Sequence, residues 1–223
     1  MELIKLKGLT PLSAGALQLV YQHPTEPDYL IKILRLDRMR KRWARKSRGL
    51  PIRRRFGLYN AWVRELKSYI ELRSRSPDGE CPEFVQRHHG LTDTDLGIGL
   101  LVGKVKDRAG GLAPTLASVV RQQGFTEQLR KQFVDLQAKI EALNLVTSDI
   151  NANNILVGWS EQQGHHLVII EGLGDNTLIP VKTMFRFLNR ASIRRHFART
   201  FIHLERLDRE RAAQGVHNQE QTR

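Results

Sequence analysis

The stretch VTSDINANNILVG, residues 146–158, places polar side chains that can do chemistry directly before the apolar residues of a strand. Asp149 and Asn154 stand five positions apart, and a second apolar run ends at Glu171 before a glycine. A loop aspartate can accept the proton of a hydroxyl group, and carboxylate and amide oxygens are the hard ligands that Mg²⁺ prefers. This order of residue types is typical of metal-assisted phosphate chemistry.

The two segments SDINANNILVG and LVIIEGLGD together resemble the catalytic loop and the metal-binding turn of the protein-kinase-like fold. The resemblance implies that Asp149 positions or deprotonates an acceptor hydroxyl. It also implies that Asn154 and Glu171 hold Mg²⁺ beside bound ATP. The apolar runs predict two strands that form a hairpin and hold these side chains in place.

Elements earlier in the chain fit the same resemblance. The run YLIKIL, residues 29–34, resembles the strand that carries a phosphate-binding lysine, which is Lys32 here. In a strand Lys32 faces away from its neighbours Ile31 and Ile33. Apolar residues at helical spacing predict a helix over 58–73. Glu65 lies on the apolar face of that helix and would be the partner of Lys32.

The segment LSAGALQLVY stands where the resemblance expects a glycine-rich loop over the phosphates, although it keeps one glycine. Main-chain groups of four residues would cover the phosphates there: Ser13, Ala14, Gly15 and Ala16.

Taken together, these segments resemble the PhoP regulatory network (YrbL) family, a group of short bacterial chains with a protein-kinase-like pattern. The resemblance covers SAGALQLVYQHPTEPDYLIKIL, RELKSYIEL and DINANNILV, roughly residues 3–200. The family name implies a place in a bacterial two-component regulatory network, and it does not imply a substrate.

Two departures from the kinase pattern leave the activity open. Val146, Thr147 and Ser148 stand where a histidine usually precedes the catalytic aspartate. Glu171 replaces the usual metal-binding aspartate, and Asp175 follows four positions later. A small-molecule or atypical phosphotransferase is therefore one hypothesis. A catalytically inactive pseudokinase that acts as a regulatory binding module is the other.

Positive charge is concentrated in one segment. The chain has a net charge of +13, with 36 Lys and Arg against 23 Asp and Glu. Residues 35–55, RLDRMRKRWARKSRGLPIRRR, contain eleven of the basic residues and one acid, so their net charge is +10. The segment is either a solvated insertion or a site for a polyanion. A basic nucleic-acid-binding protein is a third hypothesis, in which Trp43 stacks on a base and Arg53–Arg55 bind phosphates.

The pattern predicts an α+β chain with a protein-kinase-like, two-lobed fold. A strand-rich N-lobe is expected over about 1–104, with strands at 3–12, 16–22 and 29–34. A reduced helical C-lobe is expected over about 105–212, followed by a polar tail at 213–223. A second helix is predicted over about 126–143 with Thr126 as its N-cap.

The remaining sequence signals point to a protein of a reducing compartment. Cys81 is the one cysteine, so no internal disulfide can form. We expect a cytoplasmic protein, because no apolar run is long enough to span a bilayer. The pairs His88–His89 and His165–His166 are expected not to chelate metal, because adjacent strand residues face opposite ways.

Overall fold

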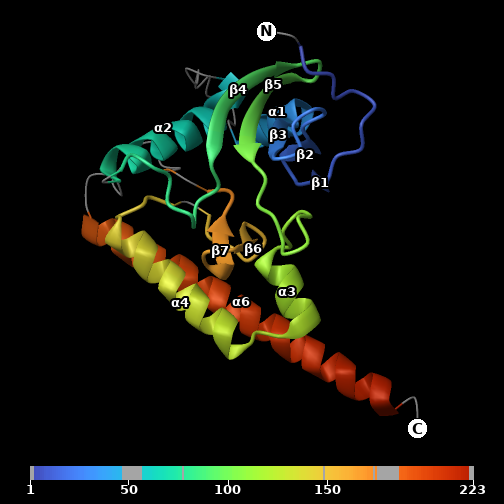
Figure 1. The fold of residues 1–223 in the computed structure, drawn as a ribbon, viewed down its shortest axis with the longest axis vertical. Coiled ribbons are helices and arrows are strands. Elements are labelled where there is room, and N and C mark those ends of the chain that lie inside the picture. Colours follow the sequence, from blue (N-terminus) through green and yellow to red (C-terminus); the bar gives the residue numbers. More distant parts are fainter. Residues whose placement is uncertain are drawn as a thin grey trace. The chain divides into compact units, whose positions relative to one another are not determined.

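The structure is a computed structural model of an α+β protein (Figure 1). It describes residues 3–46, 57–76, 78–147, 149–172, 174 and 186–220, with the backbone alone at 42–43, 45–46 and 215–220. The chain divides into two compact units. Unit 1 comprises Met1–Tyr69 and Gln86–Lys104, and unit 2 comprises Ile70–Val85 and Val105–Arg223.

Unit 1 contains an antiparallel sheet of five strands, and the hairpin of its last two strands is the long curved pair in Figure 1. In sheet order the strands are β1 (Ser13–Ala14), β2 (Gln18–Gln22), β3 (Tyr29–Leu34), β5 (Gly97–Gly103) and β4 (His88–Thr94). Lys32 lies in the middle of β3, between Val20 of β2 and Leu100 of β5. The lysine predicted from YLIKIL therefore occupies a central strand.

Alternation along β3 builds two separate apolar clusters. Leu30 and Leu34 pack with Trp62 of α2 (Asn60–Arg75) on one face of the sheet, whereas Ile31 and Ile33 pack with residues of the N-terminal segment on the other. Because side chains alternate across a strand, Lys32 shares the face of Leu30 and Leu34. That face is the one covered by α2.

Three helical segments of unit 1 follow β3. They are α1 (Leu36–Lys46), the 3₁₀ turn η1 (Gly57–Tyr59) and α2 (Asn60–Arg75), whose C-terminal turns belong to unit 2. Leu36 and Met39 attach α1 to the same apolar cluster as Trp62. The helix predicted over 58–73 is confirmed, with boundaries slightly shifted.

Unit 2 is built on three helices and a two-stranded hairpin, with α4 lying alongside α6 in Figure 1. These elements are α3 (Leu116–Gln123), α4 (Glu127–Ala142), β6 (Ile155–Ser160), β7 (Gly164–Ile169) and α6 (Arg186–Glu220). The Thr126 hydroxyl accepts a hydrogen bond from the Leu129 amide at 3.3 Å, so the predicted N-cap of α4 is confirmed. The rings of Phe133 and Phe197 join α4 to α6, with centroids 4.8 Å apart.

The structure differs from the predicted elements at several places. Residues 3–12 do not form a strand, because the amides of Leu6 and Lys7 bond to the Asp95 carboxylate instead of to a neighbouring strand. The first part of the basic segment is the helix α1, and α3 was not predicted. Helix α6 continues to Glu220, into the expected polar tail. No helix in the described part of the chain is long and apolar enough to cross a membrane.

Gly99 gives a direct test of the packing on the face of β3 that carries Ile31 and Ile33. A Cβ atom at this position would lie 2.6 Å from Cγ2 of Ile31, the residue preceding Lys32. We expect Gly99→Ala to lower the free energy of unfolding by about 1–3 kcal/mol, because the two faces of β3 are already filled. Urea unfolding followed by tryptophan fluorescence measures the change.

Gly103→Ala on the same strand is the matched control, because the nearest atom to its added Cβ is 3.6 Å away. Equal costs for the two substitutions would show that the space beside Ile31 does not constrain the sheet.

Candidate functional site

Asp149 is held by the side-chain amides of two nearby asparagines. Asn151 Nδ2 donates to Oδ1 of Asp149 at 2.9 Å, and Asn154 Nδ2 donates to Oδ2 at 3.1 Å. Each carboxylate oxygen therefore has one amide donor and keeps further lone-pair capacity. The structure thus brings together the two residues that the sequence singled out, and the two amides fix the orientation of the carboxylate.

Asn151 shapes the loop between them. Its Oδ1 accepts hydrogen bonds from the main-chain amides of Asn153 and Asn154, at 3.0 and 3.2 Å. Such bonds from asparagine to amides two and three positions later stabilise a turn. No role was predicted for Asn151 from the sequence. The feature that could have indicated one is its position in the DINANN stretch, two residues after the aspartate.

Glu171 follows β7 and lies beside this loop. The Ile170 amide donates to the Asn154 carbonyl at 3.0 Å, which extends the pairing of β6 with β7. At Gly172, φ is 89°, and an added Cβ would lie 2.7 Å from the carbonyl oxygen of Asp149. The turn after Glu171 therefore packs directly on the backbone of Asp149, and glycine is required there.

Two helices of unit 2, α6 and α3, hold the Asp149 loop in place through hydrogen bonds. The Thr200 hydroxyl, buried on α6, donates to the Ile150 carbonyl at 2.9 Å. The Ala117 amide in the first turn of α3 donates to the Ala152 carbonyl at 3.0 Å. Because an N-terminal helix amide has no partner within its own helix, α3 is free to make this bond. The loop is thus tied to the helical core on both sides of Asn151.

The residues present fit a magnesium ion in their donor atoms. The amide nitrogen of Asn154 is turned to Asp149, which leaves its carbonyl oxygen as the atom able to coordinate a cation. Glu171 adds a carboxylate. Mg²⁺ is commonly held by one or two such groups, with phosphates and water completing its shell. Among the described residues no group of three or more His, Cys, Asp and Glu side chains forms a metal site, and Asp175 lies outside them.

Unit 1 contains the second set of predicted residues. Lys32 is buried with 2% of its surface exposed, and it influences Glu65 of α2. Burial raises the pKa of Glu65. The contact with His88 and the positive charge of Lys32 lower this pKa, and Arg64 lowers it to a smaller extent. Together these effects are larger than that of burial, so the pKa of Glu65 lies below its ordinary value. The positive charge of Lys32 is thus one of the groups that lower the pKa of Glu65, and the pairing of the two residues stays a prediction.

His88 is the residue that the sequence analysis missed in unit 1. Its Nε2 lies 3.2 Å from Oε1 of Glu65, and its side chain is 2% exposed. His89, the next residue, is exposed and contacts the ring of Tyr29. Only the packing of β4 against α2 places His88 beside Glu65, so no local pattern could have shown the contact.

The predicted phosphate loop is an exposed turn between β1 and β2. Ser13, Ala14, Gly15 and Ala16 are all exposed, and the Gly15 amide donates to the Gln18 carbonyl at 2.9 Å. That amide is therefore already used within the turn. Arg35 Nη1 donates to the Gly15 carbonyl at 3.3 Å, so the structure adds a cation at this turn.

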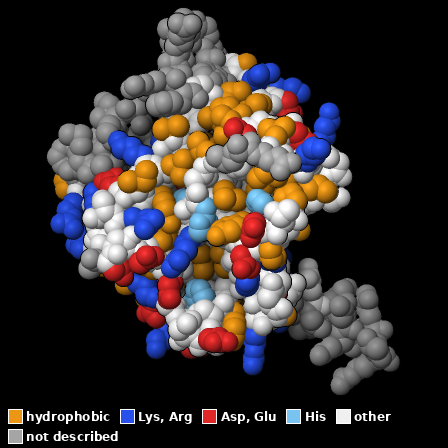
Figure 2. Space-filling model, turned by 45° about the horizontal axis from the view of Figure 1, so that its top comes forward, with side chains coloured by type: hydrophobic (Ala, Val, Ile, Leu, Met, Phe, Trp, Pro, Cys, Tyr) orange, Lys and Arg blue, Asp and Glu red, His pale blue; other side chains and the backbone are white. Residues whose placement is uncertain are grey.

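The described part of the basic segment is α1. Arg38, Arg40 and Lys41 are exposed, while Leu36 and Met39 pack against the core. On the face of the molecule in Figure 2, Lys and Arg side chains are interspersed with Asp and Glu. Residues 47–56, which include Arg53–Arg55, and the Trp43 side chain lie outside the described residues.

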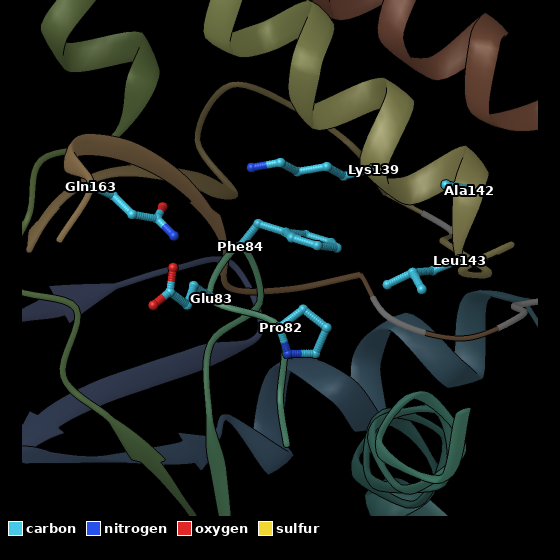
Figure 3. Close-up of a pocket in the computed structure, with 7 residues that line it drawn as sticks. All are labelled: Pro82, Glu83, Phe84, Lys139, Ala142, Leu143 and Gln163. Atoms are coloured by element: carbon cyan, nitrogen blue, oxygen red, sulfur yellow. The ribbon is translucent and has the colours of Figure 1, made fainter. Parts of the chain in front are cut away.

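A pocket of about 360 Å³ lies elsewhere in unit 2. In Figure 3 the Phe84 ring lies between the Lys139 side chain and Pro82, with Glu83 and Gln163 to one side. Ala142 and Leu143 complete the lining. None of the predicted site residues lines this pocket, so it is separate from the Asp149 loop.

The close approach of Gly172 to Asp149 predicts a large effect of a single methyl group. We expect Gly172→Ala to destabilise the protein by about 1–3 kcal/mol more than the control Gly164→Ala. Gly164 also has a positive φ, 65°, but its added Cβ would have no atom within 4 Å. The difference in urea midpoint isolates the contact with Asp149, and equal midpoints would contradict the close packing of this turn.

The lowered pKa of Glu65 predicts the pH dependence of stability. Ionised Glu65 stabilises the fold at pH values above its ordinary pKa of 4.5, and the contribution is lost as the pH falls through the lower folded pKa. We expect Glu65→Gln to be less stable than wild type at pH 7 and to lose less stability on acidification.

Unfolding free energies measured between pH 7 and pH 3 test this expectation. Glu71→Gln, on the same helix but only partly buried beside Arg75, is the control and should follow the wild-type profile. Parallel profiles for wild type and Glu65→Gln would contradict the prediction.

This chain is similar in sequence to a known family and to two known proteins. Residues 4–205 match the family described as PhoP regulatory network protein YrbL. The YrbL proteins of Escherichia coli (strain K12) and Shigella flexneri are each 28% identical over 184 residues, which is 81% of this chain and 78% of theirs. A crystal structure of Rad53 1-466 in complex with AMP-PNP has a TM-score of 0.48 and 15% identity, and covers 73% of this chain and 37% of that chain.

The family match extends over both units and includes Lys32, Glu65, Asp149, Asn154 and Glu171. The resemblance seen in the sequence is thereby confirmed at the level of the family, and this chain belongs to the PhoP regulatory network protein YrbL family.

Proposed function

We propose that the chain binds ATP with Mg²⁺ in the manner of protein kinases and acts as a small-molecule or atypical phosphotransferase. The observation that carries the proposal is the buried Lys32, whose positive charge lowers the pKa of the half-buried Glu65. A buried ammonium group is costly unless it is paired. A lysine kept inside a sheet by a carboxylate from a helix is suited to bind phosphate as a fixed point charge.

The Asp149 loop supports the same proposal from unit 2. Asn154 and Glu171 would hold Mg²⁺, which neutralises the charge of the phosphates when it is bound. Asp149, fixed by two amides, would position an acceptor hydroxyl and take its proton. Such a site works by positioning and by charge neutralisation, and it forms no covalent intermediate with the protein.

A catalytically inactive pseudokinase that acts as a regulatory binding module is the second candidate. Thr147 stands at the place of the usual histidine, and its hydroxyl is buried without a hydrogen-bond partner among the described residues. Glu171 is longer than the usual aspartate by one methylene group. Both features favour binding without efficient turnover. A polyanionic partner at residues 35–55 would be compatible with either candidate, given the exposed cations of α1.

Thermal denaturation with ATP and Mg²⁺ tests nucleotide binding. Ligand at a hundred times its Kd stabilises the folded protein by about 2.7 kcal/mol, which raises Tm measurably. We expect this increase in wild type, a smaller one in EDTA, and none in Lys32→Met or Asn154→Ala. The ligand-induced change is compared within each variant, because Lys32→Met also removes a positive charge that acts on Glu65.

Asn153→Ala is the matched control for Asn154→Ala, since Asn153 is exposed at the neighbouring position. A full increase in Tm for Lys32→Met, or none for wild type at millimolar ATP, would refute the proposal. If wild type binds, phosphate release that is lost in Asp149→Asn identifies an enzyme. Equal background release by both identifies the binding module.

A further inference from the structure

His88 occupies an unusual position for a histidine. It begins β4 opposite Val102 of β5, and its ring meets that of Tyr69 edge-on, with centroids 4.6 Å apart. Its side chain is 2% exposed, and Nε2 lies 3.2 Å from Oε1 of Glu65. Unit 1 alone supplies all of these groups. The carboxylate that accompanies Lys32 therefore has a second basic neighbour.

The contact is close in distance but is not an aligned hydrogen bond. Both ring nitrogens of His88 and Oε1 of Glu65 are buried without an aligned hydrogen-bond partner among the described residues. A buried neutral polar group in that state is destabilising. A proton on His88 converts the contact into an attraction between an imidazolium and a carboxylate, which depends less on alignment than a hydrogen bond between neutral groups does.

Other charged groups surround the pair. Lys32 approaches from β3, and Arg64 precedes Glu65 on α2; both favour the ionised carboxylate. On β4 itself Arg87 and His89 flank His88 in the sequence. The pKa of His89 is lowered by burial and by the positive charges of Arg87 and His88. Glu65 is thus the anion that balances several cations in this part of unit 1.

We propose that His88 is a positioning residue whose protonated ring shares the Glu65 carboxylate with Lys32, so that protonation of His88 strengthens the binding of nucleotide phosphates by Lys32. The coupling to phosphate rests on the proposed function, whereas the pairing of His88 with Glu65 does not.

The sign of the coupling follows from the charges. When His88 is neutral, the single negative charge of Glu65 balances Lys32. When His88 is protonated, the three groups carry one net positive charge, and more of the Lys32 charge is available to a phosphate. Because binding free energies are reciprocal, phosphate binding must in turn favour the protonated ring. Nucleotide affinity should therefore be higher at pH 6 than at pH 8.

The pairing is tested without nucleotide by NMR titration of the imidazole groups. His88→Phe identifies the His88 signal by its loss. We expect the titration midpoint of His88 to fall in Glu65→Gln, because the variant lacks the negative charge that holds the proton. The signal of His203, a partly exposed residue of α6, serves as an internal control. An unchanged midpoint for His88 would overturn the pairing.

The coupling is tested by the Kd of ATP with Mg²⁺, measured by isothermal titration calorimetry at pH 6, 7 and 8. We expect the ratio of variant Kd to wild-type Kd for His88→Phe to be about fivefold larger at pH 6 than at pH 8. The ionisation of ATP itself cancels in this ratio. His89→Phe, the same substitution on the exposed neighbour, should show no such trend.

The outcomes separate the two claims. A ratio independent of pH overturns the coupling and leaves the proposed function intact. Absence of ATP binding at every pH overturns the proposed function and the coupling together, and the NMR titration still decides the pairing. In the Glu65→Gln background, His88→Phe should no longer affect the pH dependence. A persisting effect there would show that His88 acts through another group.

Discussion

The burial of the Lys32 ammonium group is the constraint on which unit 1 depends. An unpaired charge in a sheet interior would cost several kcal/mol, so a carboxylate must reach it. The charge of Lys32 acts on Glu65 of α2, and Trp62, one turn earlier on that helix, packs into the apolar cluster of β3 and β5. Apolar packing thus positions the helix, and the helix positions the charge. The pair is a product of the core around it.

In unit 2 the corresponding constraint is main-chain hydrogen bonding. In the loop that carries Asp149, the carbonyls of Ile150 and Ala152 accept hydrogen bonds from α6 and α3. The side chain of Asn151 then bonds two amides inside the turn, and the amide groups of Asn151 and Asn154 orient the carboxylate. Gly172 allows the Glu171 turn to pack on this backbone. Hydrogen bonds and close packing restrain these groups together, which suits a site that works by preorganisation.

The departures from the kinase pattern are easier to interpret against these contacts. The buried Thr147 cannot replace an imidazole as a hydrogen-bonding ring, whereas the loop around Asp149 remains fully built. Unit 1 contains a histidine of another kind, His88, beside the carboxylate of the lysine pair.

The sequence by itself determined the local elements and the residues with chemical potential. The strand with Lys32, the helix with Glu65, the cap at Thr126 and the hairpin after Asn154 follow from periodicity and capping, which depend on neighbours in the chain. The sequence did not determine the conformation of residues 3–12, where the Asp95 carboxylate accepts hydrogen bonds from the main-chain amides of Leu6 and Lys7. Nor did it determine α3, a short helix whose buried residues face α6, or the roles of Asn151 and His88. Those features depend on contacts between distant segments, such as β4 with α2, and only the tertiary structure decides which side chains meet there.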